Sequence, residues 1–227
     1  MASGVSVIAI DGPVAAGKTA VGRELARTLG FGYLDTGIMY RAITWLALKK
    51  GIPVDDPDSL GELARANPLE IVGDDSNRVT VACHTLGPEL RDSSVDGNVS
   101  AVSMASPVRK ELVAQQRQTA IKGKIVMIGR DIGTVVLPGA DLKVFLTASP
   151  ENRAQRRWQE MLDRGEEIEL FTVLSETLAR DKKDSGREDS PLKPAEDAWE
   201  LNTDGLDIQQ VVQKIIDRAE KSAGGQI

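Results

Sequence analysis

A glycine-rich segment near the N-terminus has the residue types and spacing of a phosphate-binding loop. The segment GPVAAGKT, residues 12–19, fits the pattern G-x-x-x-x-G-K-[ST]. Backbone N–H groups of such a loop point at phosphate oxygens, Lys18 adds a positive charge near the β- and γ-phosphates, and the Thr19 hydroxyl suits Mg²⁺. We therefore predict a nucleoside triphosphate site made of Gly12, Pro13, Val14, Ala15, Ala16, Gly17, Lys18, Thr19 and Ala20.

Arginines elsewhere in the chain are spread in a way that suits a second phosphate. Arg130 follows the apolar run 125–128, and open parallel sheets bind ligands at the carboxyl ends of their strands. A lone arginine is also compatible with a solvated surface charge, and that interpretation stays open for Arg153 and Arg164. The other arginines of this set are Arg41, Arg109, Arg156, Arg157, Arg180 and Arg187.

The elements that must hold these residues alternate between strand-like and helix-like patterns. Such alternation predicts an α/β fold with a parallel β-sheet core and helices on both faces. A hairpin at 69–82, with its turn at 73–77, interrupts the alternation and suggests a small insert. Strands are expected at about 5–10, just before 36, 125–129, 142–147 and 198–202, and helices at about 18–29, 38–50, 94–105, 107–121, from 150, 169–183 and 207–222.

The composition limits the classes of protein that fit. The chain has 227 residues, 41% hydrophobic and 27% charged, which is typical of one soluble globular domain. Aromatic residues make up only 4% and the net charge is −6, so a nucleic-acid surface built on base stacking is disfavoured. The single cysteine, Cys83, excludes an intrachain disulfide and fits a reducing compartment. The N-terminal segment lacks the basic region of a signal peptide, and no apolar run is long enough to span a membrane. We therefore expect a cytoplasmic protein that uses neither nucleic acid nor a membrane as a partner. We also expect a monomer, although none of these features bears on the oligomeric state.

Motifs of two other phosphate-loop classes are absent or misplaced. A GTPase needs N-K-x-D, which the chain lacks, and its one D-x-x-G, residues 58–61, falls in a polar turn region. A motor ATPase usually has an acidic pair at a strand end, and none is found. A kinase is favoured, because arginines surround a second phosphate. Two alternatives stay open: a kinase for another nucleotide or an alcohol, and a nucleotide-binding regulator with slow or no hydrolysis.

The order of several motifs resembles that of the bacterial cytidylate kinases, within the nucleoside monophosphate kinase group. The segments are IDGPVAAGKT, YLDTGIMYRA, SAVSMASPVR, GRDIGTVV, KVFLTAS with NRAQRR, and RDKKDSGR with SPL. The resemblance implies a phosphate-loop kinase that transfers the γ-phosphoryl group of ATP to CMP or dCMP with Mg²⁺. It also implies a single kinase domain, residues 1–227, with a hairpin-and-helix insert for the monophosphate at about 65–105 and a helical lid at about 153–168.

The same resemblance implies roles for particular residues. Catalytic contacts with the phosphates fall to Lys18, Arg130, Arg157 and Arg187. Asp131 would accept from the cytosine amino group and Arg109 would donate to the base, in the donor and acceptor logic of base readout. Arg180 and Asp184 match positions at the ribose. The complete acceptor set is Thr36, Arg41, Ser100, Arg109, Arg130, Asp131, Arg180, Asp184 and Arg187.

One position departs from the family pattern. Cytidylate kinases commonly have an acidic residue just before GRDIG, which holds Mg²⁺ through water, and this chain has Ile128 there. The metal ligands that remain as candidates are Thr19 and Asp35.

Overall fold

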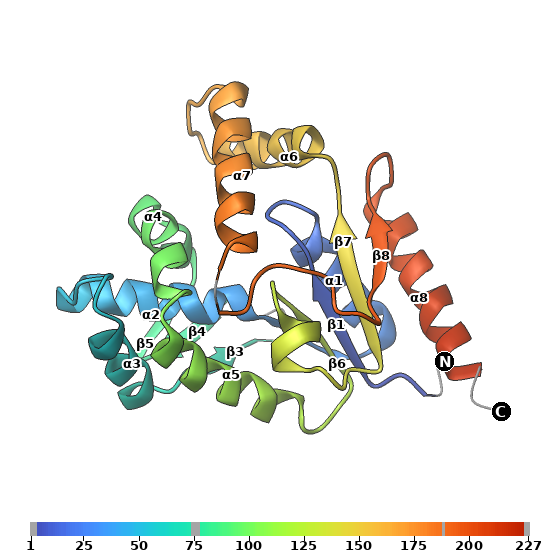
Figure 1. Ribbon diagram of the computed structural model, residues 1–227, viewed down its shortest axis with the longest axis horizontal. Helices are drawn as coiled ribbons and strands as arrows, with labels where there is room; N and C mark the ends of the chain where they lie inside the picture. The colour runs from blue at the N-terminus through green and yellow to red at the C-terminus, as the bar shows by residue number, and fades with distance from the viewer. Residues whose placement is uncertain (1–3, 74–77, 188, 225–227) are drawn as a thin grey trace. The chain divides into compact units, whose positions relative to one another are not determined.

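The computed structural model describes residues 4–73, 78–187 and 189–224 (Figure 1). The chain divides into two compact units. The larger unit contains Met1–Phe31 and Lys124–Ile227, and the smaller unit contains Gly32–Gly123. No helix in the described ranges has the length and apolar character needed to cross a membrane.

The larger unit is organised around parallel strands. These are β1 (Val7–Asp11), β6 (Ile125–Ile128), β7 (Leu142–Thr147) and β8 (Trp199–Asn202). Strand β1 pairs in parallel with β6 and β7, and β7 pairs in parallel with β8. Within this unit the strand order is β6-β1-β7-β8, while β2 (Gly32–Asp35) belongs to the smaller unit. The predicted α/β fold with a parallel sheet is confirmed.

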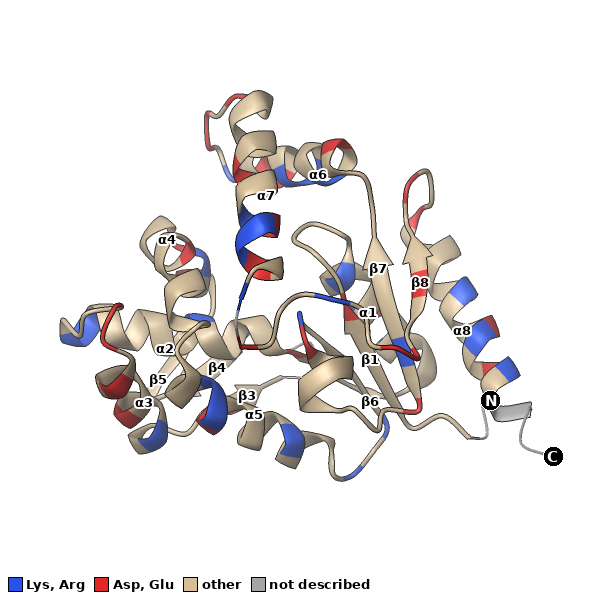
Figure 2. Ribbon diagram, in the orientation of Figure 1, with Lys and Arg blue, Asp and Glu red and all other residues tan. Residues whose placement is uncertain are grey.

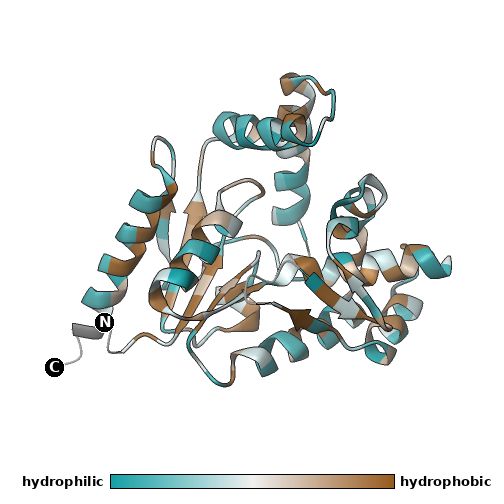
Figure 3. Ribbon diagram, turned by 180° about the vertical axis from the view of Figure 1, so that it is seen from behind, coloured by the Kyte–Doolittle hydropathy of each residue, from teal (hydrophilic) through white to brown (hydrophobic). Residues whose placement is uncertain are grey.

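Buried apolar side chains explain why these segments form strands. Ile8, Ile10, Met127, Ile128 and Leu146 are at most 1% exposed. Strands covered on both faces read as continuous apolar runs, which is the pattern of β1 and β6. Figure 3 shows the hydrophobic residues gathered on the strands of this sheet and along one side of α8.

The helices of the larger unit begin and end at recognisable signals. Helix α1 (Lys18–Leu29) ends at Gly30, which has φ 66°, and packs against α8 (Ile208–Gly224). Helix α6 (Pro150–Asp163) begins with a Ser149 side-chain cap and Pro150 in its first turn, and it packs against α7 (Leu170–Ser185). A single wide turn, η2 (Ile132–Val136), follows β6.

The smaller unit combines helices with a separate sheet. Its helices are α2 (Thr36–Lys50), α3 (Pro57–Ala66), the short η1 (Pro88–Arg91), α4 (Ser93–Val102) and α5 (Ser106–Ala120). Its antiparallel strands are β3 (Glu70–Val72), β4 (Arg78–Val81) and β5 (His84–Leu86). The predicted hairpin corresponds to β3 and β4, and residues 74–77 of its predicted turn lie outside the described residues.

Helix α3 was not predicted, although its start carries a clear signal. Asp56 caps the helix by accepting from the backbone N–H of Ser59 at 3.1 Å, and Pro57 occupies the first turn. The helix packs on α5 so closely that a Cβ on Gly61 would lie 2.3 Å from the Cβ of Pro107. The prediction failed because the acidic and proline-rich residues 53–58 resemble a loop.

Candidate functional site

The predicted phosphate loop connects β1 to α1, and its backbone geometry depends on glycine. Gly12 has φ 149°, and a Cβ there would lie 2.2 Å from the carbonyl oxygen of Leu146 in β7. Gly17, with φ 92°, is the N-cap of α1. Ala15 has φ 56°, a left-handed conformation that costs an L-residue about 1 kcal/mol or more. The chain therefore maintains a strained turn directly before a helix N-terminus, an arrangement that suits an anion.

Lys18 lies across the loop that contains it. Its side-chain Nζ donates to the carbonyl oxygens of Gly12 at 2.8 Å and Pro13 at 2.7 Å, and the residue is 7% exposed. These bonds hold the ammonium group beside the backbone turn that would enclose a phosphate. Thr19 follows in the first turn of α1 and is half-buried.

The turn after β6 is fastened to the end of β1. Gly129 donates its N–H to the carbonyl oxygen of Ile10 at 3.0 Å. The Asp11 carboxylate accepts from the N–H groups of Ile132 at 2.8 Å and Gly133 at 2.7 Å. Burial raises the pKa of Asp11 from 3.8 to about 6, although these two N–H bonds and Lys18 oppose the rise. Asp11 thus fixes the segment that carries Arg130 and Asp131, next to the phosphate loop.

Asp184 on α7 gathers two of the predicted acceptor arginines. Its oxygens accept from Nε of Arg130 at 3.0 Å and from Nη2 of Arg187, and its side chain is 2% exposed. Burial by itself would raise the pKa of Asp184, but the charges of Arg130, Arg187 and Arg180 outweigh it and hold that pKa below its ordinary value. Figure 2 shows the basic residues gathered on the C-terminal part of α7. Nε of Arg187 is buried with no hydrogen-bond partner in the described part of the chain.

Helix α6 carries the arginines of NRAQRR, and they differ in environment. Arg153 is 3% exposed, so the interpretation of it as a solvated surface charge is wrong. Arg156 donates to the hydroxyl and carbonyl oxygens of Thr203, both at 3.0 Å. The Thr203 hydroxyl in turn lies 3.5 Å from the carbonyl oxygen of Ala16 in the phosphate loop. Arg157 is half-buried and lies 3.5 Å from Glu160.

The smaller unit contains predicted residues at the start of α2. Asp35 caps this helix, because its Oδ1 accepts from the N–H of Gly37 at 3.0 Å. Thr36 is 4% exposed at the first helical position. One turn later, Nη1 of Arg41 contacts Asp96 at 2.6 Å and the carbonyl oxygen of Leu90 at 2.8 Å.

Two further predicted residues of this unit are buried polar groups. Arg109 on α5 is 4% exposed, and its Nη1 donates to the hydroxyl of Tyr40 at 3.3 Å. Its guanidinium carbon lies 5.9 Å from the centre of the Tyr40 ring. The hydroxyl oxygen of Ser100 on α4 is buried and has no hydrogen-bond partner in the described part of the protein. Buried polar atoms are usually paired, so an unpaired hydroxyl at this point suits a polar ligand.

Comparisons with known proteins agree with these features. The family model described as cytidylate kinase matches residues 8–221. The chain belongs to the cytidylate kinase family. Two proteins named cytidylate kinase, from Streptococcus pneumoniae strains 70585 and Hungary19A-6, are each 47% identical to it, over 94% of this chain and 97% of theirs. A solved structure of an uncharacterized protein from Eubacterium ventriosum covers 95% of this chain and 98% of its own at a TM-score of 0.51 and 13% identity, a likeness of fold alone.

Membership of the cytidylate kinase family confirms the prediction of a kinase, made from the motifs. The predicted site residues fall into both units. The larger unit holds Lys18, Arg130, Asp131, Arg157, Arg180, Asp184, Arg187 and the loop Gly12–Ala20, and the smaller unit holds Asp35, Thr36, Arg41, Ser100 and Arg109.

The donor set of this chain fits a magnesium ion that arrives with a nucleotide. Within the described ranges, no three or more His, Cys, Asp or Glu side chains gather into a metal site. Mg²⁺ commonly keeps several waters and takes only one or two protein ligands besides phosphate oxygens. Thr19 in the larger unit and Asp35 in the smaller unit remain the candidate protein ligands. Ile128 is 1% exposed within β6 and contributes no carboxylate.

Sequence reasoning missed Asp11 and Asp181 as candidate positioning residues. Asp11 carries a recognisable signal, because an aspartate at the end of a buried strand is placed directly before the first loop glycine. Asp181 has no such signal. It lies in a charged helical segment, and only the folded chain brings its carboxylate to Arg153.

Proposed function

We propose that the protein transfers the γ-phosphoryl group of ATP to the phosphate of CMP or dCMP, giving ADP and CDP or dCDP. The observation that carries this proposal is the adjacency of two anion-binding segments. The phosphate loop follows β1, the arginine-containing turn follows β6, and these strands pair in register with Ile10 opposite Ile128. Two phosphates held at neighbouring strand ends suit transfer from one to the other.

On the donor side, backbone N–H groups of the loop and the N-terminus of α1 bind the ATP phosphates. Lys18 and Arg157 add positive charge at the transferred group. Mg²⁺, held by Thr19, Asp35 and water, would neutralise charge on the phosphate oxygens. The loop glycines make this binding possible, since a Cβ on Gly12 would collide with Leu146.

On the acceptor side, Arg41, Arg130 and Arg187 hold the monophosphate and offset its repulsion from ATP. An acceptor phosphate oxygen bonds to the γ-phosphorus, while the bond from that phosphorus to the β–γ bridging oxygen breaks and its electron pair leaves with ADP. The attacking oxygen is already anionic near neutral pH, so no general base is required. The buried Nε of Arg187, which has no partner among the described residues, supports a ligand at this point.

Selectivity for cytosine comes from paired donors and acceptors. Asp131 accepts from the N4 amino group, Arg109 donates to N3 or O2, and Ser100 adds a hydroxyl. The Ser100 hydroxyl is buried without a partner in the described ranges, which supports this assignment. Thr36 belongs to the residues that bind the acceptor nucleotide. Arg180 and Asp184 contact its ribose. Uracil would set a carbonyl oxygen against Asp131 and leave two buried acceptors facing each other.

The organisation of the kinase follows from the same proposal. Within one kinase domain, residues 65–105 bind the monophosphate, and residues 153–168 form a lid that excludes water, the competing acceptor. We also propose that the protein is a monomer and that it acts in the cytoplasm, a reducing compartment that suits its single cysteine.

An ATP-consumption assay with CMP, dCMP, UMP, AMP and no acceptor tests the function. Turnover with CMP or dCMP should exceed turnover with UMP or AMP at least tenfold, by the cost of an unpaired buried polar group. Lys18→Met should abolish turnover. Turnover that persists in this variant would come from a contaminating kinase. Arg65→Met is a matched control, because this arginine is 65% exposed in a surface ion pair and should leave turnover unchanged.

Two results would overturn the proposal. Equal turnover of CMP and UMP would reject the assignment of the base contacts. No CMP-dependent turnover at saturating Mg²⁺, together with tight ATP binding, would favour a nucleotide-binding regulator.

A further inference from the structure

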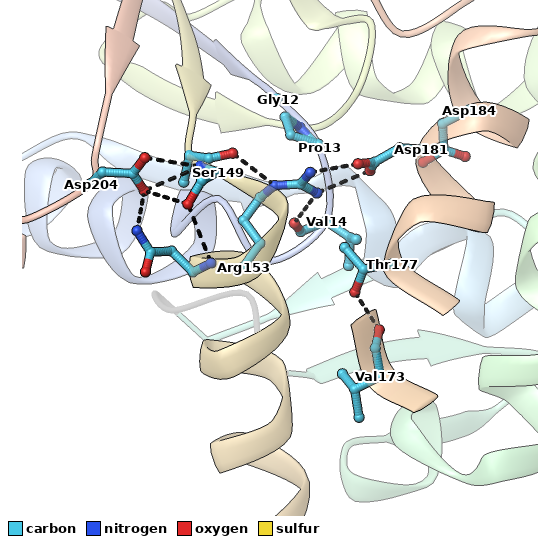
Figure 4. Close-up of polar contacts among 12 residues, drawn as sticks. Gly12, Pro13, Val14, Ser149, Arg153, Val173, Thr177, Asp181, Asp184 and Asp204 are labelled. Carbon is cyan, nitrogen blue, oxygen red and sulfur yellow. Dashed lines mark hydrogen bonds and ion pairs between the residues drawn. The ribbon is translucent and has the colours of Figure 1, made fainter. Parts of the chain in front are cut away.

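Arg153 joins three segments of the larger unit through one guanidinium group. Its Nε donates to the carbonyl oxygen of Ala148 at 3.0 Å, just before α6. Its Nη1 donates to the carbonyl oxygen of Val14, in the phosphate loop, at 3.3 Å. Nη1 and Nη2 also bind both oxygens of Asp181 on α7, at 3.0 Å and 2.5 Å (Figure 4). Such a bidentate pair fixes distance and orientation together.

The base of α6 is itself held in place, so the Arg153 side chain starts from a fixed point. Ser149 caps the helix, and its N–H donates to both oxygens of Asp204 at 3.1 Å and 3.0 Å. The Asn152 amide donates to the same carboxylate at 2.8 Å. Figure 4 shows Asp204 and Ser149 on one side of Arg153, and Asp181 on the other. The guanidinium is therefore tied by hydrogen bonds both to Val14 and to α7.

Asp181 connects Arg153 to the helix that carries proposed acceptor contacts. Asp181 follows Arg180 directly and precedes Asp184 by three residues, so it shares a helix with proposed acceptor contacts. Asp184 in turn binds Arg130 and Arg187. A chain of direct contacts therefore runs from the Val14 carbonyl through Arg153 and Asp181 into the helix that holds the acceptor arginines.

We propose that Arg153 and Asp181 form a positioning pair that couples binding of the phosphate donor to binding of the acceptor nucleotide. This inference rests on the proposed function and adds to it. Phosphate binding engages the backbone N–H groups of the loop and so fixes the orientation of the Val14 peptide groups. Arg153 transmits that orientation to Asp181, and α7 then favours the arrangement in which its acceptor contacts are ready. Coupling of this kind is reciprocal, so the acceptor should also tighten donor binding.

Isothermal titration calorimetry of CMP, with and without saturating Mg²⁺ and the β,γ-imido analogue of ATP, measures the coupling without turnover. The analogue should raise wild-type CMP affinity about fivefold or more, within the usual range of coupling between sites. In Asp181→Asn the rise should fall below about twofold, because the amide has one acceptor oxygen and cannot form the two parallel bonds that Arg153 makes to Oδ1 and Oδ2. A residue that only stabilised the fold would lower affinity equally with and without the analogue.

Arg153→Lys is the second variant. It keeps the proposal testable if Asp181→Asn does not fold. Lysine keeps a positive charge beside Asp181, so the carboxylate is not left unpaired, but lysine lacks the fork that binds Val14 and Asp181 together. It should lose the coupling as well. The measured quantity is the ratio of CMP affinities with and without the analogue. If circular dichroism shows that Asp181→Asn is unfolded, this ratio for Arg153→Lys alone tests the proposal.

Asp197→Asn is the matched control. Its carboxylate pairs at 2.8 Å with Lys143, a buried cation on β7 of the same unit. This ion pair joins β7 to the segment just before β8, so its loss should keep the wild-type ratio. The proposal is overturned if the wild type shows no coupling while it still turns over CMP, or if both variants keep the wild-type ratio. Failure of the wild type to bind or turn over CMP would instead reject the proposed function.

Discussion

One aspartate is buried at the end of β1 and another in the last turns of α7. The pKa values of these two carboxyl groups shift in opposite directions. Asp11 is 5% exposed and Asp184 is 2% exposed. The pKa of Asp11 is raised to about 6, whereas the pKa of Asp184 is lowered. Burial acts on both groups in the same direction, because it disfavours the charged form.

The partners of the two carboxylates account for the difference. Asp184 lies between two arginines, and their charges outweigh the cost of burial. Asp11 instead accepts two neutral N–H groups, and the negative charge of Asp131 nearby adds to the effect of burial. The comparison indicates different structural roles: Asp184 is the counter-ion of Arg130 and Arg187, whereas Asp11 orders the turn after β6.

Asp184→Asn should have the largest effect on stability. Removing one partner of a buried ion pair commonly costs about 3–5 kcal/mol, because the remaining charge is buried and unpaired. We expect the unfolding free energy to fall by about 3 kcal/mol, at the lower end of that range since Arg130 is 21% exposed. Urea denaturation of the two proteins at pH 7 measures this change.

Glu111→Gln is the control for that experiment. Its side chain is 24% exposed and its partner Arg65 is 65% exposed, so this surface pair should contribute at most about 1 kcal/mol. If Asp184→Asn costs no more than this control, the arginines do not depend on Asp184 and the comparison with Asp11 loses its basis.

The titration of Asp11 should appear as a pH dependence of stability. The folded chain holds the Asp11 proton more tightly than the unfolded chain does, because the pKa rises from 3.8 to about 6 on folding. The contribution of Asp11 is therefore greatest below pH 3.8 and declines as the pH rises through 6. Between pH 4.5 and 7 the wild type should lose about 2 kcal/mol of unfolding free energy relative to Asp11→Asn.

Urea denaturation of both proteins at several pH values provides this comparison. All other titrating groups are shared, so their contributions cancel in the difference. A difference that stays constant from pH 4.5 to 7 would mean that Asp11 has an ordinary pKa and that its two N–H bonds balance the cost of burial.

The phosphate loop and the parallel sheet could be predicted from the sequence because both depend on contiguous residues. The loop requires glycine at fixed positions, and the strands require apolar runs, so both leave local patterns. The bidentate partner of Arg153 could not be predicted. Asp181 lies 28 residues away on another helix, and nothing in the local sequence distinguishes it from its charged neighbours.

The burial of Arg153 could not be predicted from the sequence either. It shares one helix with Arg156 and Arg157, and the spacing alone gives all three equal standing. Only burial separates them, and burial depends on what α7 and the phosphate loop bring to that point. Helix α3 differs, since its cap and first-turn proline were present in the sequence and were outweighed by a loop-like composition.

Asp131→Asn should change selectivity more than stability. The proposed acceptor of the cytosine amino group would become an amide, which can also donate to the carbonyl of uracil. We expect the preference for CMP over UMP, as the ratio of kcat/KM values, to fall about tenfold while the KM for ATP stays within about twofold. An unchanged preference would show that Asp131 does not contact the base. Its role would then be structural, like that of Asp11 in the turn after β6.

Asp96→Asn should have the smallest effect, and it extends the comparison to the other unit. Asp96 pairs with Arg41, another proposed acceptor arginine, but the two side chains are 21% and 18% exposed. Water and salt screen such a pair, so the unfolding free energy should fall by less than about 1 kcal/mol, and about 0.5 M NaCl should remove most of that loss. The loss in Asp184→Asn should persist in the same salt, because the Asp184 and Arg187 side chains are only 2% and 8% exposed. Equal salt sensitivity of the two variants would show that burial does not distinguish the arginine pairs of the two units.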